Sequence, residues 1–388
     1  MRAYLGTIKG VYIMNAIYGL AGSFVGIFIP IYLLRQNLDP ANVFRFYIVY
    51  SLGVIVFSFF ANYLTRRLGL RKTVLLGYPF LFLYFFLLYT LEKYGVPLYF
   101  LALVSSLQVS LYWFPLHIWL TNTSRMGSIG SDMGRFYAVS QTVGLFAPIV
   151  SAVLIGSFGF KVVFVIAVMI YLFSVIPLFY LPEYSFKEKM SLSNFASLFK
   201  KYPRLFFVAA LEDIRGEAEG IIWPIIIYLS LRNILSVGYV GTISAVGAVL
   251  FVLLVGSYAD KIDKRKLLGS GALIVAIIWA LRMATSSAVA SYALTLAASF
   301  FAALTLVPIS SIMYGVAKRE SVSTFILFRE SSGVVGRLVL FSLALLLVSS
   351  INYIFLLPAL ACLGTWILST KNLGDGLQSK LTLDTAKT

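Results

Sequence analysis

The chain has 388 residues, of which 60% are hydrophobic and 16% aromatic, while only 12% carry a charge. Soluble domains average about 25% charged residues, so this composition excludes a water-soluble globular protein. The formal net charge of +16 would suit nucleic acid, but the basic residues fall in short loops between apolar stretches. The composition therefore indicates a polytopic membrane protein without a nucleic-acid partner.

Apolar stretches of about 20 residues, the length that an α-helix needs to cross a bilayer, recur along the chain. They are long and continuous, which favours helices over a barrel of short alternating strands. We expect an all-α protein with twelve transmembrane helices, at residues 10–34, 41–64, 73–92, 97–121, 136–158, 161–182, 204–231, 238–259, 267–287, 289–315, 325–349 and 351–370.

A polar segment at 183–203 divides these spans into two groups of six. We therefore expect an N-terminal bundle at 1–182 and a C-terminal bundle at 204–370, followed by a polar tail at 371–388. Within the linker, Ser191 is expected to cap a short amphipathic helix that lies on the membrane surface.

Basic residues are distributed unevenly among the loops. If the N-terminus is inside, the opposite side holds only Arg35, Lys93, Lys161 and Arg232. Because loops rich in Lys and Arg remain in the cytoplasm, both termini are expected there, in a multi-pass protein of the cell membrane. The basic loops are orientation signals first, and contact with anionic lipid is a secondary possibility.

The two groups of helices repeat each other. The loops "NYLTRRLGLRK" (62–72) and "GSYADKIDKRK" (256–266) align after a shift of 194 residues, which takes 71 to 265 and 72 to 266. The same shift aligns the glycines and proline of a G-x-x-x-G-x-x-x-P segment: Gly22, Gly26 and Pro30 with Gly216, Gly220 and Pro224. Duplicated halves around a central site are typical of transporters.

These loops resemble the signature of the major facilitator superfamily, roughly G-x-L-A-D-R-x-G-R-K between helices 2 and 3. The second copy matches at Gly256, Ala259, Asp260, Lys261, Arg265 and Lys266, whereas the first has Asn62 for the glycine and Arg66 for the aspartate. The resemblance implies alternating access, in which two bundles rock around a midplane site. No ATP-binding loop, catalytic triad, metal cluster or cofactor motif is recognisable, so we expect a non-enzyme without a cofactor.

The expected seventh span carries five ionisable residues near the middle of the bilayer, where a charge in contact with lipid is most costly: Glu212, Asp213, Arg215, Glu217 and Glu219. Each charge facing lipid there would cost about 2.5–3.5 kcal/mol, so these side chains must face protein or water. Helical spacing puts Glu212, Arg215 and Glu219 on one face, which Trp223 continues. Asp213 and Glu217 share a second face.

Two interpretations of these charges remain open. Carboxylates in a water-filled chamber can carry protons or bind solute, and a net acidic site favours a cationic or amphipathic solute. The alternative is a salt-bridge network that only locks helices 7 and 11 together. We expect Arg215 to neutralise Glu212 or Glu219, and Arg337 of the eleventh span to pair with an acid of the seventh.

The altered signature loop predicts a second cluster. In the family that the loop resembles, its aspartate meets the N-terminus of helix 11 when the transporter is open outward. Here we expect Arg66 to meet Glu330, and Asp260 to meet Arg135 by pseudo-symmetry. With Arg71 and Arg265 of the same loops, these residues would form a cytoplasmic latch; simple orientation by loop charge is the alternative.

Other polar residues are weaker candidates. Asn15 and Gln141 are expected to line the cavity or to bond neighbouring helices. His117, also a possible cavity residue, is expected either to carry protons or to be a hydrogen-bonded packing residue. Arg45 and Arg282 are expected to snorkel at the outer ends of their spans. The sequence thus predicts a monomeric secondary transporter of a small solute, coupled to protons by symport or antiport. A lipid flippase or scramblase on the same fold, or a non-transporting sensor, remain as alternatives.

Overall fold

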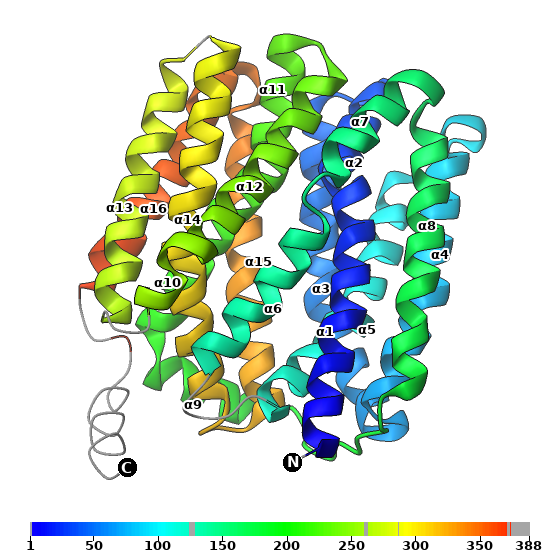
Figure 1. Ribbon diagram of the computed structural model, residues 1–388, viewed down its shortest axis with the longest axis vertical. Coiled ribbons are helices and arrows are strands. Elements are labelled where there is room, and N and C mark those ends of the chain that lie inside the picture. Colours follow the sequence, from blue (N-terminus) through cyan, green and yellow to red (C-terminus); the bar gives the residue numbers. More distant parts are fainter. Residues whose placement is uncertain (1, 124–128, 260–262, 286, 371–372, 374–388) are drawn as a thin grey trace.

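The computed structural model describes residues 2–123, 129–259, 263–285, 287–370 and Leu373. Long helices run side by side along one axis of the molecule (Figure 1). The N-terminal half contains α1 (Arg2–Val25), η1 (Gly26–Phe28), α2 (Ile29–Arg35), α3 (Pro40–Leu68), α4 (Leu70–Tyr94), α5 (Leu98–Thr123), α6 (Ile129–Val143), α7 (Ala147–Phe158) and α8 (Phe160–Tyr180).

The linker carries the short helix α9 (Leu192–Lys201). The C-terminal half contains α10 (Pro203–Glu217), η2 (Ala218–Ile222), α11 (Trp223–Leu231), α12 (Ile234–Ala259), α13 (Lys264–Met283), α14 (Ala288–Ala317), α15 (Val322–Leu346), η3 (Val348–Phe355) and α16 (Leu356–Ser369). Across the two halves, α3 packs against α15 and α7 packs against α12.

Ten helical segments of the described chain are long and apolar enough to cross a membrane. They coincide with ten of the twelve expected spans, so the prediction of an all-α membrane protein is confirmed. The other two expected spans correspond to α10–η2–α11 and to α15, which are helical but carry the charged clusters. Large apolar side chains such as Val56, Phe86 and Phe173 are at least 60% exposed on the outer helix faces, as a lipid-facing surface requires.

The first helix of each half is interrupted at the same place in the repeat. In the N-terminal half a 3₁₀ turn begins at Gly26, and in the C-terminal half a π-helical turn contains Gly220. Pro30 and Pro224 then stand in the first turns of α2 and α11, where a residue without an N–H breaks no helical hydrogen bond. The duplicated G-x-x-x-G-x-x-x-P segment therefore marks a break in both helices.

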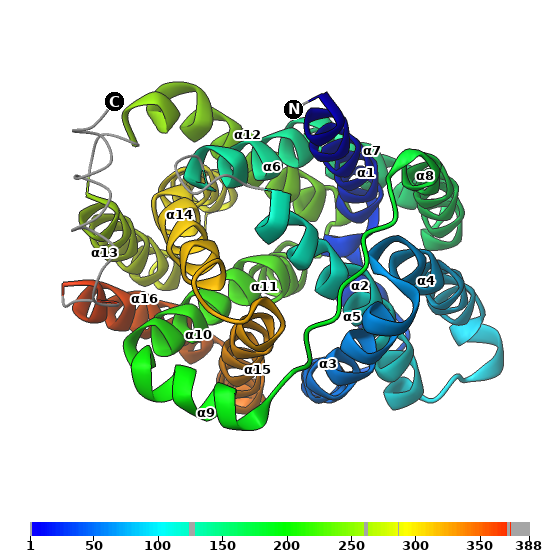
Figure 2. The ribbon, with the colours of Figure 1, turned by 90° about the horizontal axis from the view of Figure 1, so that it is seen from below.

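An extended segment at residues 182–190 leads from α8 to α9 across one end of the molecule (Figure 2). We call this segment the strap and this end the α9 end. Ser191 accepts a hydrogen bond from the Asn194 N–H at 3.2 Å, which confirms the expected cap of the linker helix. Phe195 of α9 packs against Phe328 of α15, so α9 is fixed to the C-terminal half.

Candidate functional site

The charged residues of α10 and η2 divide into two groups that face different surroundings. In the first group, Arg215 donates from Nε to Glu212 Oε2 at 3.0 Å, and the Thr305 hydroxyl donates to the same oxygen at 2.7 Å. Both side chains of the ion pair are less than 10% exposed. The expected neutralisation of Glu212 by Arg215 is thus confirmed, within the C-terminal half.

Glu219 has a different basic partner. Arg282 of α13 donates from Nη1 and Nη2 to its two carboxylate oxygens at 2.7 and 2.8 Å. The guanidinium carbon of Arg282 lies 4.2 Å from the ring centre of Trp223 and 4.4 Å from that of Trp279. The expectation that Arg282 snorkels is wrong, because its side chain is fully buried and the partly buried carboxylate of Glu219 and two indoles hold it there.

Trp223 belongs to this packed group. Its indole N–H donates to the Thr295 hydroxyl at 2.9 Å, and its ring is 2% exposed. It is not among the residues that line the two cavities described below. Regular helical spacing put Trp223 on the face of Glu212 and Arg215, whereas the π-helical turn at Ala218–Ile222 changes the register beyond Glu217.

The second group lies between α10 and α15. Arg337 Nη1 is 3.7 Å from Asp213 Oδ2 and 3.6 Å from Glu217 Oε1, which confirms the expected pairing of Arg337 with acids of this span. Both distances exceed those of a tight N–H···O bond. The Asp213 and Glu217 side chains are 42% and 27% exposed, so this group is more accessible than the Glu212–Arg215 pair, whose side chains are less than 10% exposed.

Two glycines of α15 allow this approach. A Cβ atom built on Gly333 would lie 2.0 Å from Asp213 Oδ2, and one built on Gly336 would lie 2.2 Å from the Ala210 carbonyl oxygen. Any side chain at Gly336 would therefore push α10 and α15 apart. The close contact of these helices brings Arg337 to its two carboxylates.

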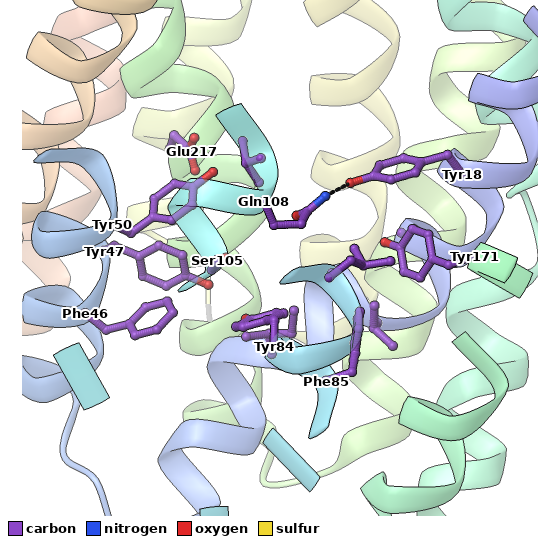
Figure 3. A pocket seen from close by; sticks show the side chains of 16 residues that line it. Tyr18, Phe46, Tyr47, Tyr50, Tyr84, Phe85, Ser105, Gln108, Tyr171 and Glu217 are labelled. Atoms are coloured by element: carbon purple, nitrogen blue, oxygen red, sulfur yellow. Dashed lines mark hydrogen bonds between the residues drawn. The ribbon is translucent and has the colours of Figure 1, made fainter. Parts of the chain in front are cut away.

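The first cavity, which we call the tyrosine cavity, has a volume of about 200 Å³. Figure 3 shows its aromatic walls. Five tyrosines and two phenylalanines line it: Tyr18, Tyr47, Tyr50, Tyr84, Tyr171, Phe46 and Phe85. Gln108 and Ser105 of α5 add polar groups, and Glu217 contributes the one charged group among the described lining residues.

The second cavity, which we call the α10–α15 cavity, is of similar size. Its charged lining residues are Glu212, Asp213, Arg215, Arg329, Glu330 and Arg337. Arg337 and Asp213 thus line this cavity while Glu217 lines the tyrosine cavity. The ion-pair cluster of Arg337, Asp213 and Glu217 consequently lies between the two cavities.

His117 of α5 joins the two halves. Its Nδ1 lies 2.6 Å from the Tyr314 hydroxyl of α14, and its Nε2 contacts Arg329 Nη1 of α15. The ring is 3% exposed and stacks on Trp113. His117 therefore bonds neighbouring helices, one of the two roles expected of it.

The expected latch residues do not form the expected contacts among the described residues. Glu330 pairs with Arg329 at 2.9 Å and approaches His117 at 3.7 Å, and the contact with Arg66 does not form in this structure. Arg135 is exposed on α6, Arg265 pairs with Asp263 of its own loop at 3.7 Å, and Asp260 lies outside the described residues. Arg66 lies near the C-terminal end of α3, whereas Glu330 lies about two turns into α15, where Arg329 and His117 are its partners.

The strap supplies carboxylates to both halves instead. Glu183 accepts from the backbone N–H of Arg71 at 3.1 Å and lies 3.5 Å from its guanidinium Nε. Glu188 accepts from the Ser323 N–H at 3.2 Å and from the Ser321 hydroxyl at 3.1 Å. Each carboxylate thus caps the N-terminus of a long helix, α4 or α15, where negative charge is favourable.

Two expected cavity residues lie elsewhere. Asn15 is 4% exposed within α1, and Gln141 is exposed on α6; neither lines one of the two cavities. The tyrosines were missed because they come from several helices and the chain has 24 tyrosines. Tyr47 and Tyr50, three residues apart, gave the one available signal of a shared helix face.

The helices, their two-part arrangement and the charges between them define a multi-pass membrane protein. Residues 11–218, more than half of the chain, match the family model described as Major Facilitator Superfamily. The chain belongs to the Major Facilitator Superfamily and is a membrane transporter. A comparison with curated protein sequences gives no match.

Solved structures share this fold at low sequence identity. The human organic anion transporter MFSD10 (TETRAN) is 14% identical, with a TM-score of 0.68, over 92% of this chain and 99% of that one. Two structures of POT family transporters, in complex with 5-aminolevulinic acid and with a thioalcohol-conjugated peptide, are each 12% identical. Their TM-scores are 0.71 and 0.72, over 93% of this chain and 94% of theirs.

Proposed function

We propose that the protein is a secondary active transporter that moves a small solute by alternating access and couples it to protons. In this proposal α10–η2–α11 and α15 also cross the bilayer, which gives twelve spans with both termini in the cytoplasm of a cell-membrane protein. The α9 end is then the cytoplasmic end. Its basic loops support this orientation, because such loops remain inside.

The observation that carries the proposal is the position of Arg337 between Asp213 and Glu217. Asp213 and Arg337 line one cavity and Glu217 lines the other. Asp213 or Glu217 could release Arg337 and bind a proton or a solute instead. Such an exchange would break an ion pair that separates the two cavities. The ion pairs are loose, so such an exchange breaks no tight hydrogen bond.

The charge balance supports proton coupling. The described interior ion pairs include the carboxylates of Glu212, Asp213, Glu217, Glu219 and Glu330, and the guanidinium groups of Arg215, Arg282, Arg329 and Arg337. With His117, which lies 3.7 Å from Glu330, counted as neutral, five negative charges against four positive ones leave one unbalanced negative charge. A single proton or a single cation would neutralise it, and an unbalanced charge at membrane depth is costly.

Purified protein in liposomes tests this function. A panel of cationic, neutral, zwitterionic and anionic solutes is offered with and without an imposed pH gradient. We expect at least one solute to accumulate only when the gradient is present, and Arg337→Ala to abolish that accumulation. Scrambling of labelled lipid with no solute uptake would instead favour the lipid-handling alternative.

A further inference from the structure

We propose that the tyrosine cavity binds a small organic cation, of the quaternary ammonium or alkylamine class, between its aromatic walls and Glu217. This inference rests on the proposed transport function and names the substrate class of that site. It draws on the composition of the cavity, its charge and its size.

Seven of the sixteen residues that line the cavity are aromatic, and aliphatic side chains such as Val25, Ile29 and Leu81 complete its walls. Tyr47 and Tyr50 stand next to Glu217, and Tyr84 and Phe85 lie across the cavity from it (Figure 3). Rings of Tyr and Phe attract a cation placed over their faces, and aromatic boxes are a recurring means of holding quaternary ammonium groups. The walls therefore favour a cationic ligand over an anionic one.

The rings are held in place by their neighbours. Tyr18 is stacked on Tyr112 at a centroid distance of 3.7 Å, and its hydroxyl accepts from the Gln108 amide at 2.7 Å. Tyr47 stacks on Phe341 of the C-terminal half at 5.1 Å. A preformed box loses little side-chain freedom when the ligand enters, which favours binding.

Glu217 supplies the charge of the site. Among the described lining residues it is the one charged side chain and the one contribution from the C-terminal half. Its partner Arg337 also contacts Asp213, so a cation that binds Glu217 leaves Arg337 with a carboxylate. The ligand then supplies the one positive charge that the interior lacks.

The volume limits the ligand. Pockets for drug-sized molecules occupy roughly 300–1,000 Å³, whereas this cavity holds about 200 Å³. The ligand is therefore expected to be a compact cation, with one charged nitrogen and a short substituent, rather than a large amphipathic drug. Since a bound cation and a bound proton would both neutralise Glu217, the cation would be exchanged for protons.

The experiment compares choline with 3,3-dimethylbutan-1-ol, a neutral molecule of the same shape, by calorimetry on the purified protein. We expect choline and tetramethylammonium to bind, and the neutral analogue to bind at least about 10-fold more weakly. Glu217→Gln should remove this preference. Tyr50→Leu should weaken choline binding by roughly 2- to 30-fold, the range that corresponds to a cation–π contact, whereas Tyr50→Phe should preserve it.

Glu92→Gln, which removes a distant carboxylate paired with Lys161, is the matched control and should leave binding unchanged. Each variant is first shown to unfold at a temperature close to that of the wild type. Equal binding of the neutral analogue, no binding of any cation by folded protein, or unchanged binding in Glu217→Gln would overturn the inference. Gradient-driven uptake of a non-cationic solute in the liposome panel would overturn this substrate class but leave the transport function intact.

Discussion

Arg282 and Glu219 form a two-pronged ion pair in the interior of the C-terminal half, with N···O distances of 2.7 and 2.8 Å. The planar guanidinium lies close to the indole rings of both Trp223 and Trp279. This arrangement satisfies a charge that neither lipid nor a packed apolar core would accept. It fixes η2, the break between α10 and α11, to α13.

Removing one partner of this pair should destabilise the protein. We expect Arg282→Met to lower the free energy of unfolding by about 3–5 kcal/mol, because the Glu219 carboxylate, only 17% exposed, is left without a partner for its charge. The double variant Arg282→Met, Glu219→Gln should recover most of this loss. Thermal unfolding in detergent measures both effects, and a double variant no more stable than the single one would show that the pair does not act as a unit.

Arg337 should be essential for transport in a way that depends on charge. Arg337→Glu creates three neighbouring carboxylates and is expected to abolish gradient-driven uptake. A charge-reversed pair, Arg337→Glu with Glu217→Arg, should restore part of the uptake rate in liposomes. Failure of the reversed pair in a folded protein would count against a functional ion pair and in favour of a purely structural network.

Gly336 should tolerate no side chain. In Gly336→Ala the new methyl group meets the Ala210 backbone carbonyl, so α10 and α15 must separate and Arg337 must leave Asp213 and Glu217. We expect a loss of gradient-driven uptake together with a fall in stability of about 1–3 kcal/mol, as overpacking usually produces. Gly156→Ala on α7, where no atom lies within 4 Å of the added group, is the control and should behave like the wild type.

The strap should hold the α9 end closed. Glu183 binds α4 of one half and Glu188 binds α15 of the other. The five residue steps between them span at most about 17–18 Å, so the two helix ends cannot separate far while both caps remain. Glu188→Gln, which weakens one cap, should increase the reaction of a cysteine placed at Ser310 in the α10–α15 cavity with an impermeant thiol reagent.

The native Cys362 is fully buried, so it is not expected to react with the impermeant reagent in this labelling experiment. Lys187→Gln, a change at an exposed neighbour in the strap, should leave the labelling rate unchanged. Equal rates in the wild type and in Glu188→Gln would mean that the cap does not control opening at this end.

The helical architecture could be predicted from the sequence because lipid imposes simple rules on length and hydropathy. The duplicated glycines and prolines were recognisable in the sequence as a repeat, and the structure places a helix break at both copies. The pairing of Arg337 was predictable because an arginine so deep in a span needs a carboxylate. These inferences depend on local pattern and on the cost of charge in a membrane.

The remaining features depend on contacts between distant segments. Arg282 could not be matched with Glu219 from spacing, because the π-helical turn at Ala218–Ile222 turns Glu219 toward α13. In the sequence, the strap carboxylates Glu183 and Glu188 are not distinguishable from other charges of the linker. Their positions at two helix ends are seen only in the structure. The tyrosine cavity is lined by residues of α1, α3, α4, α5 and α8 and by Glu217 of α10. The pattern within a single helix could not predict it.

Proton movement evoked by solute in liposomes tests the central claim most directly. The vesicles enclose a pH-sensitive dye, and the solute identified by the uptake panel is added outside. We predict a prompt change in internal pH with the wild type and with Glu92→Gln, and none with the double variant Asp213→Asn, Glu217→Gln. A change of wild-type size in the double variant would show that these carboxylates do not couple solute to protons.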